Sequence, residues 1–301
     1  MILGYLLWGD RGDCSMECAF SICSFLSRQE VDAVCVLTDR PELLGVFSCH
    51  PKVRVHTVPT SDFIGWYGEK RFIYRAKIKG LQKLVELNPG EDILFLDTDT
   101  FCAGDAMAIR KHLAQGGFCM HHSAGNMNDD KGFGEDRRVI WHNLKNREWN
   151  GIRIGDDARH WNSGCIGLPG GKAKEVMENV LMLNDAILAG LKDGESPKLS
   201  EEIAYSMILG ASGEVMDVAD IVGHYYANKA PWQNAIYRLF AECHAKGNSL
   251  EQDIEAVQNF DFWAIPIHSH IRRWRRRIDC YMKKLLPDKR IRYFPGMTSR
   301  R

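Results

Sequence analysis

Short apolar runs alternate with amphipathic stretches along most of the chain. The apolar runs predict buried strands at residues 2–8, 33–37 and 53–58. After Asp13 apolar residues recur at helical spacing, and a second helix is predicted over residues 71–87, where Asn88-Pro89-Gly90 ends it. Because strands and helices alternate, the pattern predicts an α/β chain with a mostly parallel sheet flanked by helices.

The same pattern continues beyond residue 100, with one interruption. Further strands are predicted at residues 117–121, 165–168 and 214–219, and further helices at 172–191, 201–209 and 232–246. Residues 125–161 are rich in Gly, Asn, Asp and Trp, and we interpret them as a long polar loop. Long polar loops usually carry residues that bind a ligand.

Two acidic residues follow an apolar strand abruptly. Ile93-Leu94-Phe95-Leu96 reads as a buried strand, and Asp97-Thr98-Asp99 comes directly after it. If the backbone stays extended, Asp97 and Asp99 leave from the same face. Two close carboxylates repel unless a proton or a divalent cation compensates them, and oxygen ligands suit Mn²⁺ or Mg²⁺. The alternative interpretation is an ordinary turn, which Asp and Thr also favour.

Composition indicates a globular chain with a sizeable core. The 301 residues are 45% hydrophobic and 26% charged, enough for one large domain or one domain with an appendage. No run reaches the roughly 18 apolar residues of a membrane-spanning helix, so we expect a soluble cytoplasmic protein. The ten cysteines lie mainly within apolar segments, which favours reduced thiols over a disulfide framework.

The zero net charge conceals a strong asymmetry. From His268 to Arg301 there are twelve Lys or Arg and two acids, so this segment carries +10 and the rest of the chain −10. Aromatic and apolar residues are interspersed with these cations. We expect a basic helical tail that contacts an anionic membrane surface, with a solvated helix as the alternative and nucleic acid as the less favoured partner.

Four ordered blocks, at residues 72–77, 93–101, 161–167 and 223–232, resemble the GT-A glycosyltransferases, in particular the group of glycogenin and bacterial lipooligosaccharide galactosyltransferases. The resemblance implies a Rossmann-like GT-A domain over residues 1–245 and a C-terminal basic and aromatic extension over residues 246–301. It also implies that Asp97, Asp99 and His224 hold Mn²⁺ or Mg²⁺ against the diphosphate of a sugar nucleotide. For His224 the alternative is a hydrogen-bonded core histidine.

The resemblance also implies the remaining site residues. Substrate-binding positions are predicted at Trp8, Asp10, Arg75, Lys77, Asp97, Thr98, Asn162, Ser163, Gly164 and Lys229. Glu202 and Asn162 are the predicted catalytic residues, beside the transferred sugar. Two alternatives stay open: Lys77 fits a solvated helix face equally well, and Glu201 and Glu202 also suit the N-terminus of a helix.

The predicted function is transfer of a sugar, with retention, from a nucleotide-diphosphate donor to a saccharide or glycolipid acceptor. A UDP-sugar is the expected donor, and lipopolysaccharide or capsule synthesis at the inner face of the membrane the expected setting. One alternative is a sugar-nucleotide nucleotidyltransferase, although Gly9-Asp10-Arg11-Gly12-Asp13 lacks the form of that signature. The other is a catalytically silent nucleotide- or polyanion-binding protein.

Overall fold

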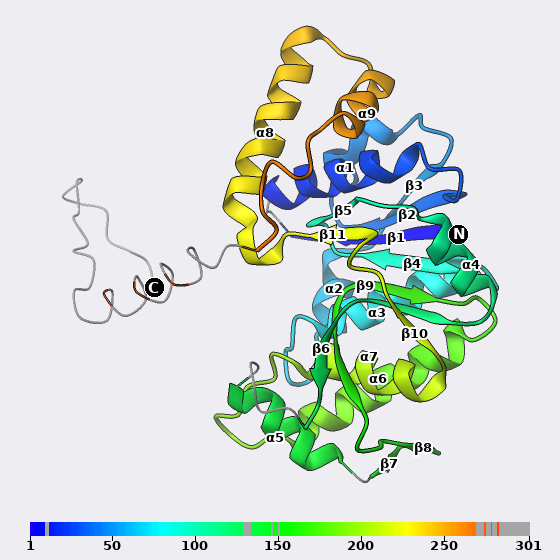
Figure 1. Ribbon diagram of the computed structural model, residues 1–301, viewed down its shortest axis with the longest axis vertical. Helices are drawn as coiled ribbons and strands as arrows, with labels where there is room; N and C mark the ends of the chain where they lie inside the picture. Colours follow the sequence, from blue (N-terminus) through cyan, green and yellow to red (C-terminus); the bar gives the residue numbers. More distant parts are fainter. Residues whose placement is uncertain are drawn as a thin grey trace.

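The computed structural model describes residues 1–9, 12–128, 134–145, 147–149 and 151–268, and the single positions 274, 278 and 282. Asp10 therefore lies outside the described residues, as does most of the predicted basic tail. The predicted fold class is confirmed, since helices cover both faces of a mostly parallel sheet (Figure 1).

The central sheet has seven strands in the order β10-β6-β9-β4-β1-β2-β3. The strands are β1 (Ile2–Leu7), β2 (Ala33–Thr38), β3 (Val53–Thr57), β4 (Ile93–Leu96), β6 (Phe118–Asn126), β9 (Arg159–Leu168) and β10 (Val215–Asp217). Strand β9 is antiparallel to both β4 and β6, and the other neighbouring pairs are parallel. Strands β1 and β4 thus end at the same edge, where α/β sheets place their ligands.

Two hydrophobic cores lie on the two faces of this sheet, because side chains alternate along each strand. Ile2 and Leu6 of β1 belong to one core, and Leu3, Tyr5 and Leu7 to the other. The first core is covered by α2 (Thr60–Trp66), α3 (Arg75–Leu87), α5 (Gly134–Leu144), α6 (Ala173–Gly190) and α7 (Ser200–Ser212). The second is covered by α1 (Gly12–Leu26), η1 (Pro41–Phe47), α4 (Met107–Ala114), α8 (Lys229–Lys246) and α9 (Leu250–Gln258).

The polar stretch 125–161 is more ordered than predicted. Strands β6 and β9 extend into it from its two ends, and α5 and the hairpin of β7 (Glu148–Trp149) and β8 (Ile152–Arg153) lie between them. The expected long loop is therefore wrong for most of this stretch. Buried Ile140 and Trp141 explain why α5 packs on the core.

Two helix starts also differ from the prediction. Helix α3 begins at Arg75 rather than at residue 71, where a turn has Arg71 in the left-handed region with φ 51°. Helix α8 begins at Lys229 rather than at Trp232. Pro231 falls in its first turn, where the missing N–H has no intrahelical acceptor to lose.

A two-stranded ribbon crosses the edge of the sheet where β1 and β4 end. Strand β5 (Thr100–Cys102) pairs antiparallel with β11 (Val222–His224), which places His224 opposite Thr100. The single-turn helix η2 (Tyr226–Asn228) then leads into α8. Helix α9 and the following residues, including Phe260 and Phe262, pack on the core beside α1, so the domain boundary predicted at residue 245 stays a prediction.

The described cysteines are free thiols, and most of them are buried. Burial raises the pKa of the Cys23 and Cys119 thiols to about 12, which keeps both protonated. Among the described helices, none is long and apolar enough to cross a bilayer.

Candidate active site

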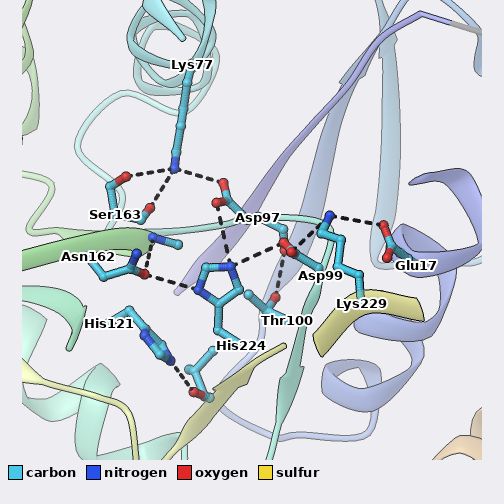
Figure 2. A network of polar contacts seen from close by, with 12 residues as sticks. Glu17, Lys77, Asp97, Asp99, Thr100, His121, Asn162, Ser163, His224 and Lys229 are labelled. Carbon is cyan, nitrogen blue, oxygen red and sulfur yellow. Dashed lines mark hydrogen bonds and ion pairs between the residues drawn. The ribbon is translucent and has the colours of Figure 1, made fainter. Parts of the chain in front are cut away.

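The two acids that follow β4 lie on a turn rather than on a continued strand. Strand β4 ends at Leu96, and β5 resumes at Thr100. The Thr100 hydroxyl donates to the Asp97 carbonyl at 2.8 Å, and the Asp97 amide donates to the Gly164 carbonyl at 2.9 Å. The predicted extended backbone is therefore wrong here, but the turn still brings both carboxylates toward one point (Figure 2).

His224 completes a group of three potential metal ligands. One ligand atom from each of Asp97, Asp99 and His224 lies within 4.8 Å of the others. The His224 Nε2 is 3.3 Å from Asp99 Oδ1 and 4.0 Å from Asp97 Oδ2. The pairing of β5 with β11 explains this proximity, because it joins residue 224 to the acidic turn across more than 120 residues of chain.

Asn162 orients the ring of His224. The Asn162 Oδ1 accepts from the Gly164 amide at 3.1 Å and from His224 Nδ1–H at 3.1 Å. With Nδ1–H bonded to Asn162, Nε2 faces the two carboxylates and is the nitrogen that would lose its proton to bind a metal. Gly164 is required for this arrangement, since a Cβ there would lie 2.1 Å from the His224 ring. The space that Gly164 provides is thus filled by the histidine.

Lys77 joins Asp97 to Glu201. Its buried ammonium, on α3, is 2.9 Å from Asp97 Oδ1 and 3.5 Å from Glu201 Oε1, and it donates to the Ser163 carbonyl at 2.7 Å. Burial opposes the charge, but the two carboxylates outweigh it and raise the pKa of Lys77. Burial also raises the pKa of Glu201 to about 7, although Lys77 opposes that shift. The solvated-face interpretation of Lys77 is therefore wrong.

Lys229 joins Asp99 to Glu17 in a second such group. Its ammonium, at the start of α8, is 3.0 Å from Asp99 Oδ2 and 3.6 Å from Glu17 Oε2 of α1. Asp99 is buried, which disfavours its charge, but His224 and Lys229 together hold the pKa of its carboxyl well below the usual range. The side chain of Lys229 is 36% exposed, whereas that of Lys77 is 8% exposed.

His121 of β6 supports His224 from behind. The two rings meet edge to face with centroids 5.0 Å apart, and His121 Nε2–H donates to the Val222 carbonyl at 3.0 Å. Burial, and then the proximity of His224, lower the pKa of His121 to about 3. His121 is therefore neutral at ordinary pH, and it adds no positive charge beside Asp97, Asp99 and His224.

The other predicted site residues lie around this cluster or apart from it. Glu202, one position after Glu201, is 3.2 Å from His160 Nε2. Thr98 lies partly buried on the acidic turn between the two aspartates. Trp8 stacks on Phe63 and donates from Nε1 to the Tyr67 hydroxyl at 2.9 Å.

Arg75 makes its described contacts on the outer side of α3. Its guanidinium binds both carboxylate oxygens of Asp185 in α6, at 2.6 and 2.8 Å, and donates to the Trp66 carbonyl at 2.9 Å. These contacts do not join it to the cluster around Asp97 and Asp99. Contact of Arg75 with a donor stays a prediction, and within the described residues its observed function is to tie α3 to α6.

Two residues of this site were not predicted, namely Glu17 and His121. Glu17 is an acid in the middle of an otherwise apolar helical face, and such a buried charge requires a partner. That signal is visible in the sequence. His121 lies in an apolar strand, where a neutral core histidine is the usual interpretation, and its packing against His224 depends on the folded arrangement of β6 and β11.

Comparison with solved structures identifies the fold. The galactosyltransferase LgtC, solved in complex with donor and acceptor sugar analogs, matches with a TM-score of 0.51 and 15% identity, over 91% of this chain and 99% of that chain. The bifunctional glycosyltransferase WbbM matches with a TM-score of 0.47 and 12% identity, over 87% of this chain and 50% of that chain. No protein-family model and no curated protein matches the sequence. The chain has a GT-A-like glycosyltransferase fold.

Proposed function

We propose that this protein is a metal-dependent glycosyltransferase. It moves a sugar from a nucleotide-diphosphate donor, with a UDP-sugar as the first candidate, to a saccharide or glycolipid acceptor. The observation that carries the proposal is the convergence of Asp97, Asp99 and His224 at the carboxyl edge of the sheet, within a fold shared with a galactosyltransferase. This is the edge at which open α/β sheets bind nucleotides.

The residues at this edge fit a hard divalent cation. Two carboxylates and one imidazole nitrogen suit Mn²⁺ or Mg²⁺, and Asn162 binds Nδ1 so that Nε2 faces the carboxylates. Asp97, Asp99 and His224 would hold the ion. When bound, it would supply positive charge against the diphosphate of the donor.

The two lysines have different parts in this proposal. Breaking the bond between the sugar and the diphosphate leaves negative charge on the phosphate, and a cation within reach stabilises that charge. Lys229 is partly exposed and can turn its ammonium to the phosphate. Lys77 is enclosed between Asp97, Ser163 and Glu201, so it holds the metal-binding turn in place rather than reaching the donor.

Glu202 is the proposed carboxylate beside the transferred sugar. Glu201 is already engaged with Lys77 and accepts from the Ser163 hydroxyl at 3.2 Å, so it is less suited to contact substrate. Glu202 is the more exposed of the two, with 17% of its side chain accessible against 5% for Glu201. Transfer with retention rests on the family resemblance and belongs to the same proposal.

The C-terminal segment is the proposed membrane contact. Trp274, Ile278 and Met282, the described positions of this segment, are spaced four residues apart, and each has a helical backbone and an exposed side chain. Residues at this spacing lie on one face of a helix, and cations surround them in the sequence. An apolar face flanked by cations suits an anionic bilayer, where a lipid-linked acceptor would be presented.

The test is titration of the protein with UDP, with and without Mn²⁺, alongside Asp99→Asn. We expect metal-dependent binding of UDP that the substitution abolishes, because it removes the charge of one ligand. Asp193→Asn, in the exposed turn after α6, is the matched control and should bind as the unchanged chain does. Absence of UDP binding would exclude a UDP-sugar donor, and absence of binding for every nucleoside diphosphate under any metal condition would refute the proposal.

A further inference from the structure

Glu17 is a buried acid that no motif of the sequence explains. It lies in α1 with a side chain 1% exposed, and its contacts come from α8, more than 200 residues away in sequence. Burying a carboxylate is unfavourable unless charged or hydrogen-bonding partners compensate it. The partners of Glu17 therefore indicate why an acid stands at this position.

The partners of Glu17 form a polar seam between two helices. Lys229 and Gln233 are four residues apart on α8, and Asp13 and Glu17 are four residues apart on α1, so each pair shares a helix face. The Gln233 side-chain amide donates to Glu17 Oε1 at 3.1 Å and to Asp13 Oδ2 at 3.3 Å. Glu17 Oε2 then faces the Lys229 ammonium at 3.6 Å (Figure 2).

We propose that Glu17 is a positioning residue that acts through Lys229, an inference that rests on the proposed function. Among the described residues, Lys229 has two anionic partners, Asp99 and Glu17. A divalent cation held by Asp99 would occupy that carboxylate and repel the ammonium of Lys229. Glu17 would remain as the anionic partner of Lys229, so the ammonium could give up Asp99 and still stay beside the donor diphosphate.

The contacts of the two Glu17 carboxylate oxygens support this positioning role. Gln233 binds the oxygen of Glu17 that points away from Lys229, and so orients the other oxygen toward the ammonium. Within the described residues that second oxygen has no hydrogen-bond partner, and it meets Lys229 only as an ion pair. The Lys229 ammonium is 3.0 Å from Asp99 and 3.6 Å from Glu17, so it lies within ion-pair distance of both carboxylates.

The experiment measures Mn²⁺ binding to the nucleotide-free protein by electron paramagnetic resonance. Glu17→Gln keeps the size of the side chain and its bond with Gln233 but removes the charge. Lys229 then has Asp99 as its remaining anionic partner and competes more strongly with the cation. We expect Mn²⁺ affinity to fall about tenfold, within the usual range of coupling between sites. Glu86→Gln, at an exposed position of α3, is the matched charge control and should leave affinity unchanged.

A double-mutant cycle shows whether Glu17 acts through Lys229. Lys229→Met removes the competitor, so Mn²⁺ should bind more tightly, and adding Glu17→Gln should then change nothing. An equal loss with and without Lys229, or a loss matched by Glu86→Gln, would overturn the inference while leaving the proposed function intact. If the unchanged chain binds no Mn²⁺, the proposed function fails first and this inference falls with it.

A second variant covers the case in which Glu17→Gln does not fold. Gln233→Leu keeps every charge and removes the amide that orients Glu17, so we expect a smaller loss of Mn²⁺ affinity in the same direction, about threefold. A purely structural tie between α1 and α8 would lower the thermal unfolding temperature without changing Mn²⁺ affinity. Unchanged affinity in a folded Gln233→Leu protein would therefore count against the inference.

Discussion

Lys77 and Lys229 each join one aspartate of the acidic turn to one glutamate, but in different surroundings. The side chain of Lys77, between Asp97 and Glu201, is 8% exposed, and that of Lys229, between the buried acids Asp99 and Glu17, is 36% exposed. The charge pattern is the same, and the difference is access to solvent. A buried ammonium cannot leave its partners without loss of stability, whereas a partly exposed one can exchange them.

This difference distinguishes the residues that hold the site in place from those that bind the ligand. The group around Lys77 connects α3, β9, α7 and the acidic turn, so it fixes the position of Asp97. The group around Lys229 connects the acidic turn to α1 and α8. We therefore expect substitutions in the first group to change mainly stability, and substitutions in the second to change ligand binding as well.

The largest expected effect is that of Lys77→Met on stability. Removing the ammonium leaves the buried Glu201 without its cation and takes one of the two cationic neighbours from Asp97, and breaking a buried pair costs about 3–5 kcal/mol. Thermal unfolding should show a large drop in midpoint. Lys83→Met, at an exposed position of the same helix, should cost less than about 0.5 kcal/mol. Equal unfolding midpoints for Lys77→Met and Lys83→Met would remove the distinction between Lys77 and Lys229.

Lys229→Met should change ligand binding as well as stability. It leaves the buried carboxylates of Asp99 and Glu17 without the ammonium, which lowers stability, although Asp99 keeps His224 as a partner. The effect of Lys229→Met on UDP binding in the presence of Mn²⁺ should be a loss of about tenfold to a hundredfold, since hydrogen bonds to charged groups contribute about 1.5–3 kcal/mol. Calorimetric titration with UDP measures this. A variant that unfolds early yet binds UDP normally would reverse the assignment.

Sequence periodicity predicted the strands and helices of the sheet because burial on both faces leaves continuous apolar runs, as in residues 93–96. It missed β5 and β11, which have three residues each and depend on each other for pairing. It also misjudged residues 125–161, where polar strand ends continue the pairing of β6 with β9. Short paired segments carry too little local signal to be distinguished from turns.

The acidic turn and His224 could be predicted from the sequence because they lie in motifs whose order resembles a known family. The partners of these residues could not. Glu201 and Glu202 are equivalent in a sequence, and the helical rotation of α7 decides which of them meets Lys77. Glu17 lies outside every motif, and its relation to Lys229 arises from the packing of α1 against α8.

Asn162→Ala should weaken metal binding without removing a ligand. Asn162 Oδ1 accepts from His224 Nδ1–H, so its loss releases the orientation of the ring. Loss of such an outer partner typically lowers metal affinity about tenfold or more. Mn²⁺ titration without nucleotide measures this. Asn162→Asp retains an oxygen acceptor and should retain the affinity; if both variants bind Mn²⁺ like the unchanged chain, Asn162 does not position the histidine.

The smallest expected effect concerns pH and His121. The pKa of His121 is about 3 in the folded protein against an ordinary value of 6.5, so between these values the unfolded chain binds more protons. Stability from this group is therefore complete above pH 6.5 and is lost as the pH falls toward 3. Between pH 6.5 and 5 the loss is about 1.5 kcal/mol.

His121→Gln should abolish that loss, because glutamine can still donate to the Val222 carbonyl but does not titrate. The comparison of unfolding at pH 6.5 and 5 isolates His121 from Glu201. Glu201 has a pKa raised to about 7, so the stability that it contributes is lost as the pH rises. Glu201 is present both in the unchanged chain and in His121→Gln, so its effect cancels in the comparison. The difference between the two pH slopes thus reports the buried histidine alone. Equal slopes would mean that His121 takes up a proton in the folded state. Because His121 packs against His224, water would then reach the surroundings of His224 more readily than those of Lys77.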